Sequence, residues 1–144
     1  MAAVFLFDQP EPASVLGCWE SVVRGFRSVV GHTAWGDFFL RNPDTGQFAV
    51  LYAFDPELVP LSFVELELFV SGYLAAPQVQ DHLIRPERLA AVEARLGPLK
   101  PSEVFIPEPY PFLGGGCEPE SYAKGSVWTF IDLVGQMQGV GTEA

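Results

Sequence analysis

Two close pairs of carboxylates are the first groups in the sequence that could carry out acid–base chemistry. Glu65 and Glu67 form one pair, and Glu118 and Glu120 form the other. Two acids hydrolyse a glycoside only when both face one substrate in environments that separate their pKa values. Glu65 and Glu67 lie two positions apart in a predicted helix, so their side chains point in different directions. Nothing in the sequence fixes the geometry of the second pair, and we expect both pairs to be solvated surface.

Cysteine and histidine offer the other reactive groups. Cys18 falls in a predicted helix, where we expect a small core residue, and Cys117 follows three glycines. The carboxylates after Cys117 would raise the pKa of its thiol and lower its reactivity. His32 and His82 stand apart from other ligands, so no group of side chains has metal-ligand spacing. We therefore predict no catalytic residue, no metal site and no cofactor, and two reduced thiols, as is usual in cytosolic proteins.

The glycine triplet at 114–116 could cradle a phosphate only in the right context. It lacks the Gly-Lys-Ser/Thr ending and the G-x-G-x-x-G pattern, and carboxylates follow it. The triplet is better explained by a close approach of the backbone to a neighbouring strand or helix.

The charge balance limits the partners. The chain has 144 residues, with 18 acidic and 8 basic side chains, a net charge of −10 and a pI near 4.4. An acidic domain repels phosphate, so we expect no binding to nucleic acid or to an anionic membrane. The apolar stretch at 127–134 is well short of the roughly 20 residues of a membrane span. Residues 1–7 are too short and lack the basic start of a signal peptide, so we expect a cytoplasmic protein that begins at Met1.

The N-terminal region is predicted to contain a short strand and a long helix. Val4 to Phe7 is a short apolar segment, and apolar residues then recur at spacings of three, four and seven over residues 12–30. The stripe consists of Val15, Leu16, Trp19, Val22, Val23, Phe26 and Val30. Gly31 is the expected end of this helix.

A hairpin and an edge strand follow. Thr33–Leu40 and Gln47–Phe54 have strand character and flank a turn containing Pro, Asp and Gly. The second run is almost wholly apolar, which is typical of a strand covered on both faces, and it is our candidate for the central strand. Leu58–Leu61 is predicted to be an edge strand, because Pro60 cannot donate a hydrogen bond from a central position.

Three helices complete the predicted elements. Ser62 and Glu65 have capping-box spacing before a helix over 63–75, whose stripe is Phe63, Leu66, Phe69, Val70, Tyr73 and Leu74. Residues 78–85 are predicted to be a surface connector before a helix from Pro86 to Gly97. A last helix over 126–138 has Ser126 as its cap.

Between these helices, residues 100–124 are rich in Pro and Gly but too apolar for a flexible linker. Val104–Ile106 is predicted to be a strand, and Tyr110, Phe112 and Leu113 an ordered loop packed on the sheet. The pattern predicts an α+β fold in one domain, residues 1–144, with an antiparallel sheet of about four strands and three to four helices.

A domain with strong negative charge, an aromatic loop and no catalytic group is typical of a binding protein with a basic partner. Coulomb attraction speeds association, which matters when an inhibitor must reach an enzyme before the enzyme acts.

The region 31–139, roughly three quarters of the chain, resembles the C-terminal domain of type VI secretion immunity proteins of the Tdi kind, which are paired with secreted DNase toxins. The motifs, in order, are Gly36-Asp37, Asp44-Thr45-Gly46-Gln47, Phe69, Leu96-Gly97-Pro98-Leu99, Ser102-Glu103-Val104-Phe105, Pro109, Leu113-Gly114-Gly115 and Gly135-Gln136-Met137. The N-terminal strand and helix of residues 1–30 leave no room for the GAD-like domain that many members carry ahead of this one.

The resemblance implies a non-enzymatic, cytoplasmic immunity protein that neutralises a cognate antibacterial toxin, most often a nuclease, by covering its active site. Such a toxin is basic because it holds nucleic acid, so an acidic surface can replace its substrate. The expected toxin-binding residues are Glu103, Glu108, Glu118 and Glu120, which flank Tyr110 and Phe112. Alternatively, these acids only keep a Pro-rich loop soluble.

Other functional hypotheses stay open. The chain could be a regulatory domain that binds a small molecule or peptide in an aromatic pocket near the glycine triplet. An enzyme that uses Cys117 or a carboxylate pair is a third hypothesis. The sequence gives no oligomeric state.

Overall fold

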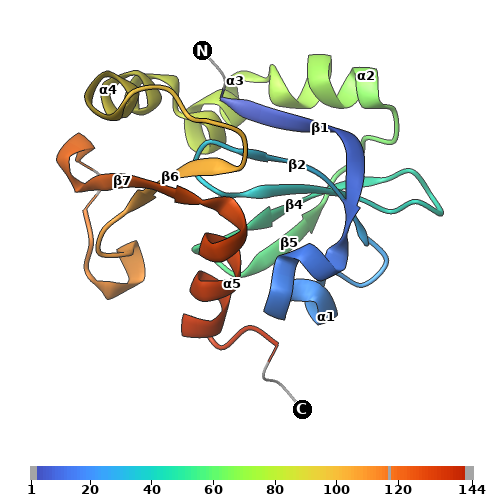
Figure 1. Cartoon of the computed structure of the whole chain (residues 1–144). Coiled ribbons are helices and arrows are strands. Elements are labelled where there is room, and N and C mark those ends of the chain that lie inside the picture. The colour runs from blue at the N-terminus through green and yellow to red at the C-terminus, as the bar shows by residue number, and fades with distance from the viewer. Residues whose placement is uncertain (1–2, 117, 142–144) are drawn as a thin grey trace.

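The computed structural model describes residues 3–116 and 118–141. The prediction that Cys117 is a reduced thiol therefore lies outside the described residues. They form an α+β fold with two antiparallel sheets (Figure 1). The larger sheet contains β1 Val4–Pro12, β2 Ser28–Thr33, β3 Phe38–Arg41, β4 Phe48–Tyr52 and β5 Glu57–Pro60. The smaller sheet pairs β6 Glu103–Pro107 with β7 Tyr122–Ser126. The predicted fold class is confirmed, with more strands than the sequence pattern indicated.

The larger sheet follows the order of the chain, β1-β2-β3-β4-β5, with antiparallel neighbours throughout. The predicted hairpin forms as β3 and β4, although Thr33 ends β2 because residues 34–37 make a turn. The middle strand of the sheet is β3. The strand predicted to be central, β4, lies next to it and is also an interior strand. The predicted edge strand is confirmed as β5, where Pro60 needs no donor on its outer side.

Both faces of the interior strands are covered, which explains their continuous apolar sequence. On one face, residues of β3 and β4 pack against η1 Ala13–Trp19, α1 Glu20–Val23 and α5 Val127–Met137. On the other face, their neighbours pack against the helical residues 69–84. Fully buried examples are Phe38, Leu40 and Leu51 on the first face and Phe39, Phe48 and Val50 on the second. Figure 1 shows α5 and α1 on one side of the sheet, and α2 Leu66–Leu68 and α3 Pro77–Val79 on the other.

The helical segments are η1 Ala13–Trp19 (3-10), α1 Glu20–Val23, α2 Leu66–Leu68, η2 Phe69–Leu74 (π), α3 Pro77–Val79, η3 Gln80–Ile84 (π), α4 Pro86–Leu96, η4 Pro111–Leu113 (3-10), η5 Pro119–Ser121 (3-10) and α5 Val127–Met137. The predicted helices α4 and α5 are confirmed, and Ser126 Oγ accepts a hydrogen bond from Thr129 N at 3.5 Å. β7 was not predicted, because Lys124 and Gly125 interrupt its apolar pattern. Within the described ranges, no helix has the length and apolar character needed to cross a membrane.

The predicted helix over 12–30 is wrong beyond its first half. The chain forms the short segments η1 and α1, with φ of 61° at Gly17, and Arg24 then adopts a φ of 54°. Residues 28–33 pair with β1 and β3 instead of continuing the helix. The apolar positions do face the core as predicted, but β-branched Val29 and Val30 favour a strand, and pairing on both sides outweighs the helical spacing.

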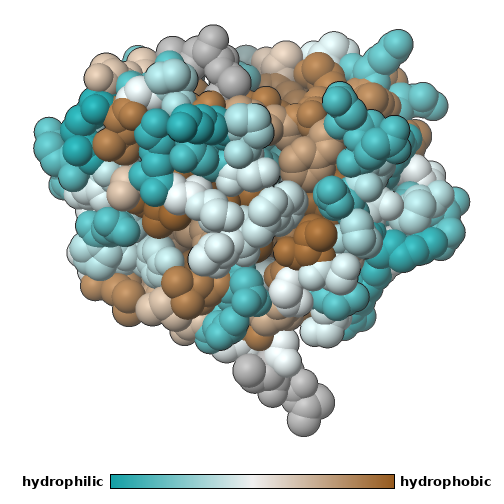
Figure 2. Space-filling model, in the orientation of Figure 1, coloured by the Kyte–Doolittle hydropathy of each residue, from teal (hydrophilic) through white to brown (hydrophobic). Residues whose placement is uncertain are grey.

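The helix predicted over 63–75 starts at Leu66, without a side-chain cap, and becomes π-helical at Phe69. This change of pitch buries Phe69 and Leu74 but leaves Leu66 and Val70 of the predicted stripe 50% and 41% exposed. Val64 and Leu68, which were not part of that stripe, are 46% and 56% exposed. Figure 2 shows hydrophobic surface gathered at the upper right, over α2. The predicted connector over 78–85 is wrong as well, because α3 and η3 occupy it.

Candidate functional site

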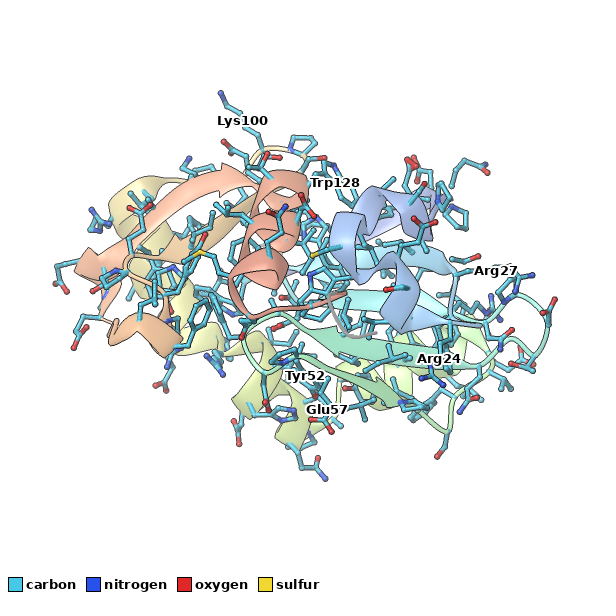
Figure 3. The ribbon with its side chains drawn as sticks, turned by 90° about the horizontal axis from the view of Figure 1, so that it is seen from below. Arg24, Arg27, Tyr52, Glu57, Lys100 and Trp128 are labelled. Carbon is cyan, nitrogen blue, oxygen red and sulfur yellow. The ribbon has the colours of Figure 1, made fainter. Side chains whose placement is uncertain are left out.

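A pocket of about 260 Å³ lies between one end of the larger sheet and the β6–β7 hairpin. Its walls come from the β2–β3 turn, the end of β4, the π-helical η3 and the ends of β6 and β7. The lining residues are Trp35, Asp37, Tyr52, Phe54, Asp55, His82, Leu83, Arg85, Pro107, Pro111 and Tyr122. Figure 3 shows Tyr52 at this end of β4, beside Glu57, the residue of β5 with which it pairs. The pocket combines aromatic walls with charged groups.

Asp37 is positioned by the turn between β2 and β3. Thr33 Oγ1 accepts hydrogen bonds from Trp35 N at 3.2 Å and from Asp37 N at 3.3 Å, and Gly36 supplies a φ of 90°. Asp37 Oδ1 then accepts a hydrogen bond from Ala53 N at 3.0 Å, just beyond β4. Burial raises the pKa of the Asp37 carboxyl, opposed by this hydrogen bond and by the positive charges of Arg85 and His82. The turn thus holds a mostly buried carboxylate in the pocket wall.

Tyr52 and His82 also line the pocket. The carbonyl of Gln78 can only accept, so the His82 Nδ1 beside it carries a proton. The other ring nitrogen, Nε2, lies 3.5 Å from the Tyr52 hydroxyl. Burial raises the pKa of the Tyr52 hydroxyl, and the Asp37 charge adds to this effect. Tyr52 therefore presents a neutral hydroxyl group to the pocket.

The backbone at Arg85 is strained. Arg85 has φ 54° and ψ 65° at the junction of η3 and α4, a backbone conformation that residues other than glycine rarely adopt. Its Nε donates to the His82 carbonyl at 2.9 Å, and Trp35 Nε1 donates to the Ile84 carbonyl at 2.8 Å. Strained residues and π-helical turns are often found at functional sites. Here they bring His82 and Arg85 to the pocket while Leu83 and Ile84 stay in the core.

The segment from Glu108 to Ser121, here called the acidic loop, borders the pocket through Pro111 and through the adjoining Pro107 and Tyr122. Glu108 N donates to the Ser121 carbonyl at 2.7 Å, which closes the base of the loop. Arg95 on α4 strengthens this base, since its guanidinium donates to the carbonyls of Pro119 and Tyr122. The acidic loop is therefore anchored at both ends.

The acidic loop brings together most of the predicted toxin-binding residues. Glu108, Glu118 and Glu120 are exposed. Tyr110 packs against Phe54 and Phe130 with ring centroids 5.7 and 6.1 Å apart, while Phe112 remains 38% exposed. The predicted ordered loop thus exists, but Phe112 and Leu113 are partly in solvent rather than covered.

Glu103 does not lie with the others. It pairs with Ser126 at the far end of the β6–β7 hairpin, and its Oε1 accepts from Lys100 N at 2.8 Å. Figure 3 shows Lys100 and Tyr52 on opposite sides of the molecule. The predicted strand covered only residues 104–106, whereas β6 covers Glu103–Pro107. The sequence therefore did not show that Glu103 and Glu108 lie at opposite ends of β6.

The glycine triplet closes the acidic loop on itself. A Cβ on Gly115 would lie 1.7 Å from the Pro109 carbonyl oxygen, and one on Gly116 would lie 2.0 Å from Glu118 Oε2. The triplet does approach other atoms closely, but the predicted partner is wrong, because these atoms belong to the loop itself and not to a neighbouring strand or helix.

The sequence reasoning missed Asp37, Tyr52 and Arg85 as site residues and placed His82 in a connector. Gly36-Asp37 does signal a turn, but nothing links that turn to a helix more than forty positions later. His32 and Cys18 belong to the core: His32 is 1% exposed, and burial raises the pKa of the Cys18 thiol. Both predicted carboxylate pairs are exposed. In residues 3–116 and 118–141 no group of three or more His, Cys, Asp or Glu side chains could hold a metal ion.

No family model and no curated protein matches the chain. A similar solved structure is the crystal structure of Atu4351 from Agrobacterium tumefaciens, with a TM-score of 0.65 and 12% sequence identity. The similarity covers 94% of this chain and 67% of that one. At this identity, the match shows a shared fold.

Proposed function

We propose that this chain is an immunity protein of the type VI secretion kind, which binds a basic secreted toxin in the cytoplasm and neutralises it by covering the active site. The proposed role is binding alone, with no catalytic step. A nuclease is the toxin class that best suits an acidic inhibitor, because its substrate groove carries the positive charge that holds nucleic acid.

The acidic loop is the observation that carries the proposal. It presents three exposed carboxylates beside the partly exposed side chains of Phe112 and Leu113. Protein interfaces combine an apolar anchor with complementary charge around it, and aromatic residues are enriched among their strongest contacts. Arg95, on the adjoining α4, bonds the backbone carbonyls of Pro119 and Tyr122, and its single positive charge is smaller than the three negative charges of the loop.

The fold supports a rigid binding surface. The loop base is closed by the hydrogen bond between Glu108 and Ser121, and Tyr110 anchors the loop to the core through Phe54 and Phe130. Little ordering entropy is then lost on binding, which favours high affinity from a small surface.

The experiment is co-expression with the product of any toxin gene found beside this one, measuring growth rescue and co-purification. The variant Glu108→Lys, Glu118→Lys, Glu120→Lys should lose rescue and weaken binding at least tenfold (~1.4 kcal/mol). The control variant reverses three exposed acids outside the acidic loop, Asp8→Lys and Glu11→Lys on β1 and Glu20→Lys on α1, and should still rescue. Equal toxin binding by the two variants would show that the acidic loop is not part of the interface. Failure of the unmodified chain to rescue or co-purify would overturn the immunity role.

The pocket favours a second candidate, a regulatory domain that binds a small molecule or peptide. Its aromatic walls and few polar groups are typical of small-molecule sites. Growth rescue distinguishes the two candidates, since a regulatory domain gives no protection against a toxin.

A further inference from the structure

We propose that the pocket beside the acidic loop receives an arginine side chain of the bound protein, with Asp37 as the acceptor of its guanidinium. The identity of that protein as a toxin rests on the proposed function. The arginine site itself rests on the groups that line the pocket.

Asp37 has an unused acceptor in the pocket. Its Oδ1 is taken by Ala53 N, and no described residue donates a hydrogen bond to Oδ2. In the described part of the chain the ion pair that forms is Arg27–Asp44 at 3.1 Å, so Asp37 has no cation within bonding distance. Arg85 lines the same pocket, but its Nε is directed to the His82 carbonyl. A mostly buried carboxylate without an ion-pair partner is stabilised by any cation that enters.

The walls suit a planar cation. Trp35 and Tyr122 lie side by side with ring centroids 5.3 Å apart, and both line the pocket with Tyr52. A guanidinium stacks on aromatic faces and forms paired hydrogen bonds with a carboxylate, which a compact ammonium does less well. The Tyr52 hydroxyl adds a polar group to the pocket lining.

The surrounding charge favours a cation over an anion. Asp55 also lines the pocket and is exposed, and the acidic loop, which carries three exposed glutamates, borders the pocket through Pro111. Arg85 and His82 are the basic side chains in the lining, and the chain as a whole carries −10. A phosphate or carboxylate ligand would meet this field at the entrance, whereas an arginine is attracted by it.

The test is an NMR titration of the protein alone with Nα-acetyl-arginine amide, compared with the neutral analogue Nα-acetyl-citrulline amide. We expect saturable shifts of the Trp35 indole N–H and the Ala53 N–H with the arginine probe, and about tenfold weaker binding of the citrulline probe. Asp37→Asn keeps an oxygen for Ala53 N but loses the charge, and should abolish the preference. Asp44→Asn, which removes an exposed acid far from the pocket, should leave it unchanged.

Absence of shifts, equal binding of the two probes, or an undiminished preference in Asp37→Asn would overturn the arginine site. A thermal unfolding curve of Asp37→Asn, with a midpoint near that of the unmodified protein, shows that any loss is local. Because no toxin is present in the titration, its result is independent of the immunity role. If the acidic-loop variant fails to bind toxin but the titration is negative, only the arginine site falls.

Discussion

At the scale of single residues, His32 shows how a polar group is accommodated in this core. Its Nδ1 lies 2.8 Å from the Thr33 carbonyl and donates to it, whereas Nε2 is buried without a partner. The rings of Phe5, Phe7 and Phe38 surround it, with centroids 5.2 to 5.9 Å away. Burial lowers the pKa of His32, and the hydrogen bond to Thr33 opposes this only partly.

This environment makes stability depend on pH. Because the pKa of His32 is lower in the folded state than the unfolded value of about 6.5, the unfolded state binds the proton more readily. The contribution of neutral His32 is fully present above that value and is lost as the pH falls below it. We expect the free energy of unfolding, measured by urea denaturation, to fall between about pH 7 and pH 5, and to fall less in His32→Phe.

His82→Asn, which replaces the exposed second histidine, is the matched control for the loss of an imidazole. The comparison uses the slope of the free energy of unfolding against pH. A packing change caused by the larger ring shifts this free energy equally at every pH and therefore does not affect the slope. An identical slope in His32→Phe and the unmodified protein would show that His32 does not titrate in this range.

At the scale of elements, the contact between η1 and α5 explains why the N-terminal helix is short. Cys18 N donates to Asp132 Oδ1 at 2.9 Å, and Trp19 Nε1 donates to the Ile131 carbonyl at 2.8 Å. Gly17 permits this approach with a φ of 61°, since a Cβ there would lie 2.1 Å from Asp132 Oδ1. The kink is therefore set by a residue more than one hundred positions away.

Gly17→Ala should destabilise the protein by about 2–4 kcal/mol, because the left-handed conformation and the clash with Asp132 act together. Gly114→Ala is the control: its φ is 90°, but no atom of residues 3–116 or 118–141 lies within 4 Å of the added Cβ. We expect it to lose only about 1 kcal/mol. Thermal and urea unfolding measure the loss of stability in both variants. Equal losses would mean that the α5 contact adjusts without strain.

The elements also show which parts of the fold are predictable from sequence. α4 and α5 were predicted because Pro86, Gly97 and Ser126 mark their ends locally. The apolar run of β4 was correctly assigned to a strand covered on both faces. The helix at 12–30 and the connector at 78–85 were wrong, because sheet pairing and tertiary packing of η3 decide those segments. The pocket was missed for the same reason, since Asp37 and His82 meet only after the sheet and helices pack.

At the scale of the whole molecule, the charge of −10 acts as a long-range field on any basic partner. Its main effect is on the rate of association, because the field guides the encounter before contacts form. The acidic loop adds a local component where contact is proposed.

The affinity for the toxin should therefore fall as salt rises from about 50 to 500 mM, chiefly through slower association, because the screening length shortens over this range. Surface plasmon resonance at several salt concentrations separates the two rates. The variant with the three reversed glutamates of the acidic loop should lose part of this salt dependence. An affinity that does not change with salt would assign the interface to apolar contacts and the charge to solubility.

The strand order of the larger sheet has a consequence for how the chain folds. Each strand pairs with its neighbour in sequence, so β1 to β5 can assemble through local contacts within the first 60 residues. One face of that sheet is covered by residues 69–84, and the other by η1, α1 and α5, of which α5 is synthesised last. During synthesis, Phe38, Leu40 and Leu51 are therefore covered only in part, by η1 and α1, until α5 emerges from the ribosome. Docking of α5 then completes the protection of this face from aggregation.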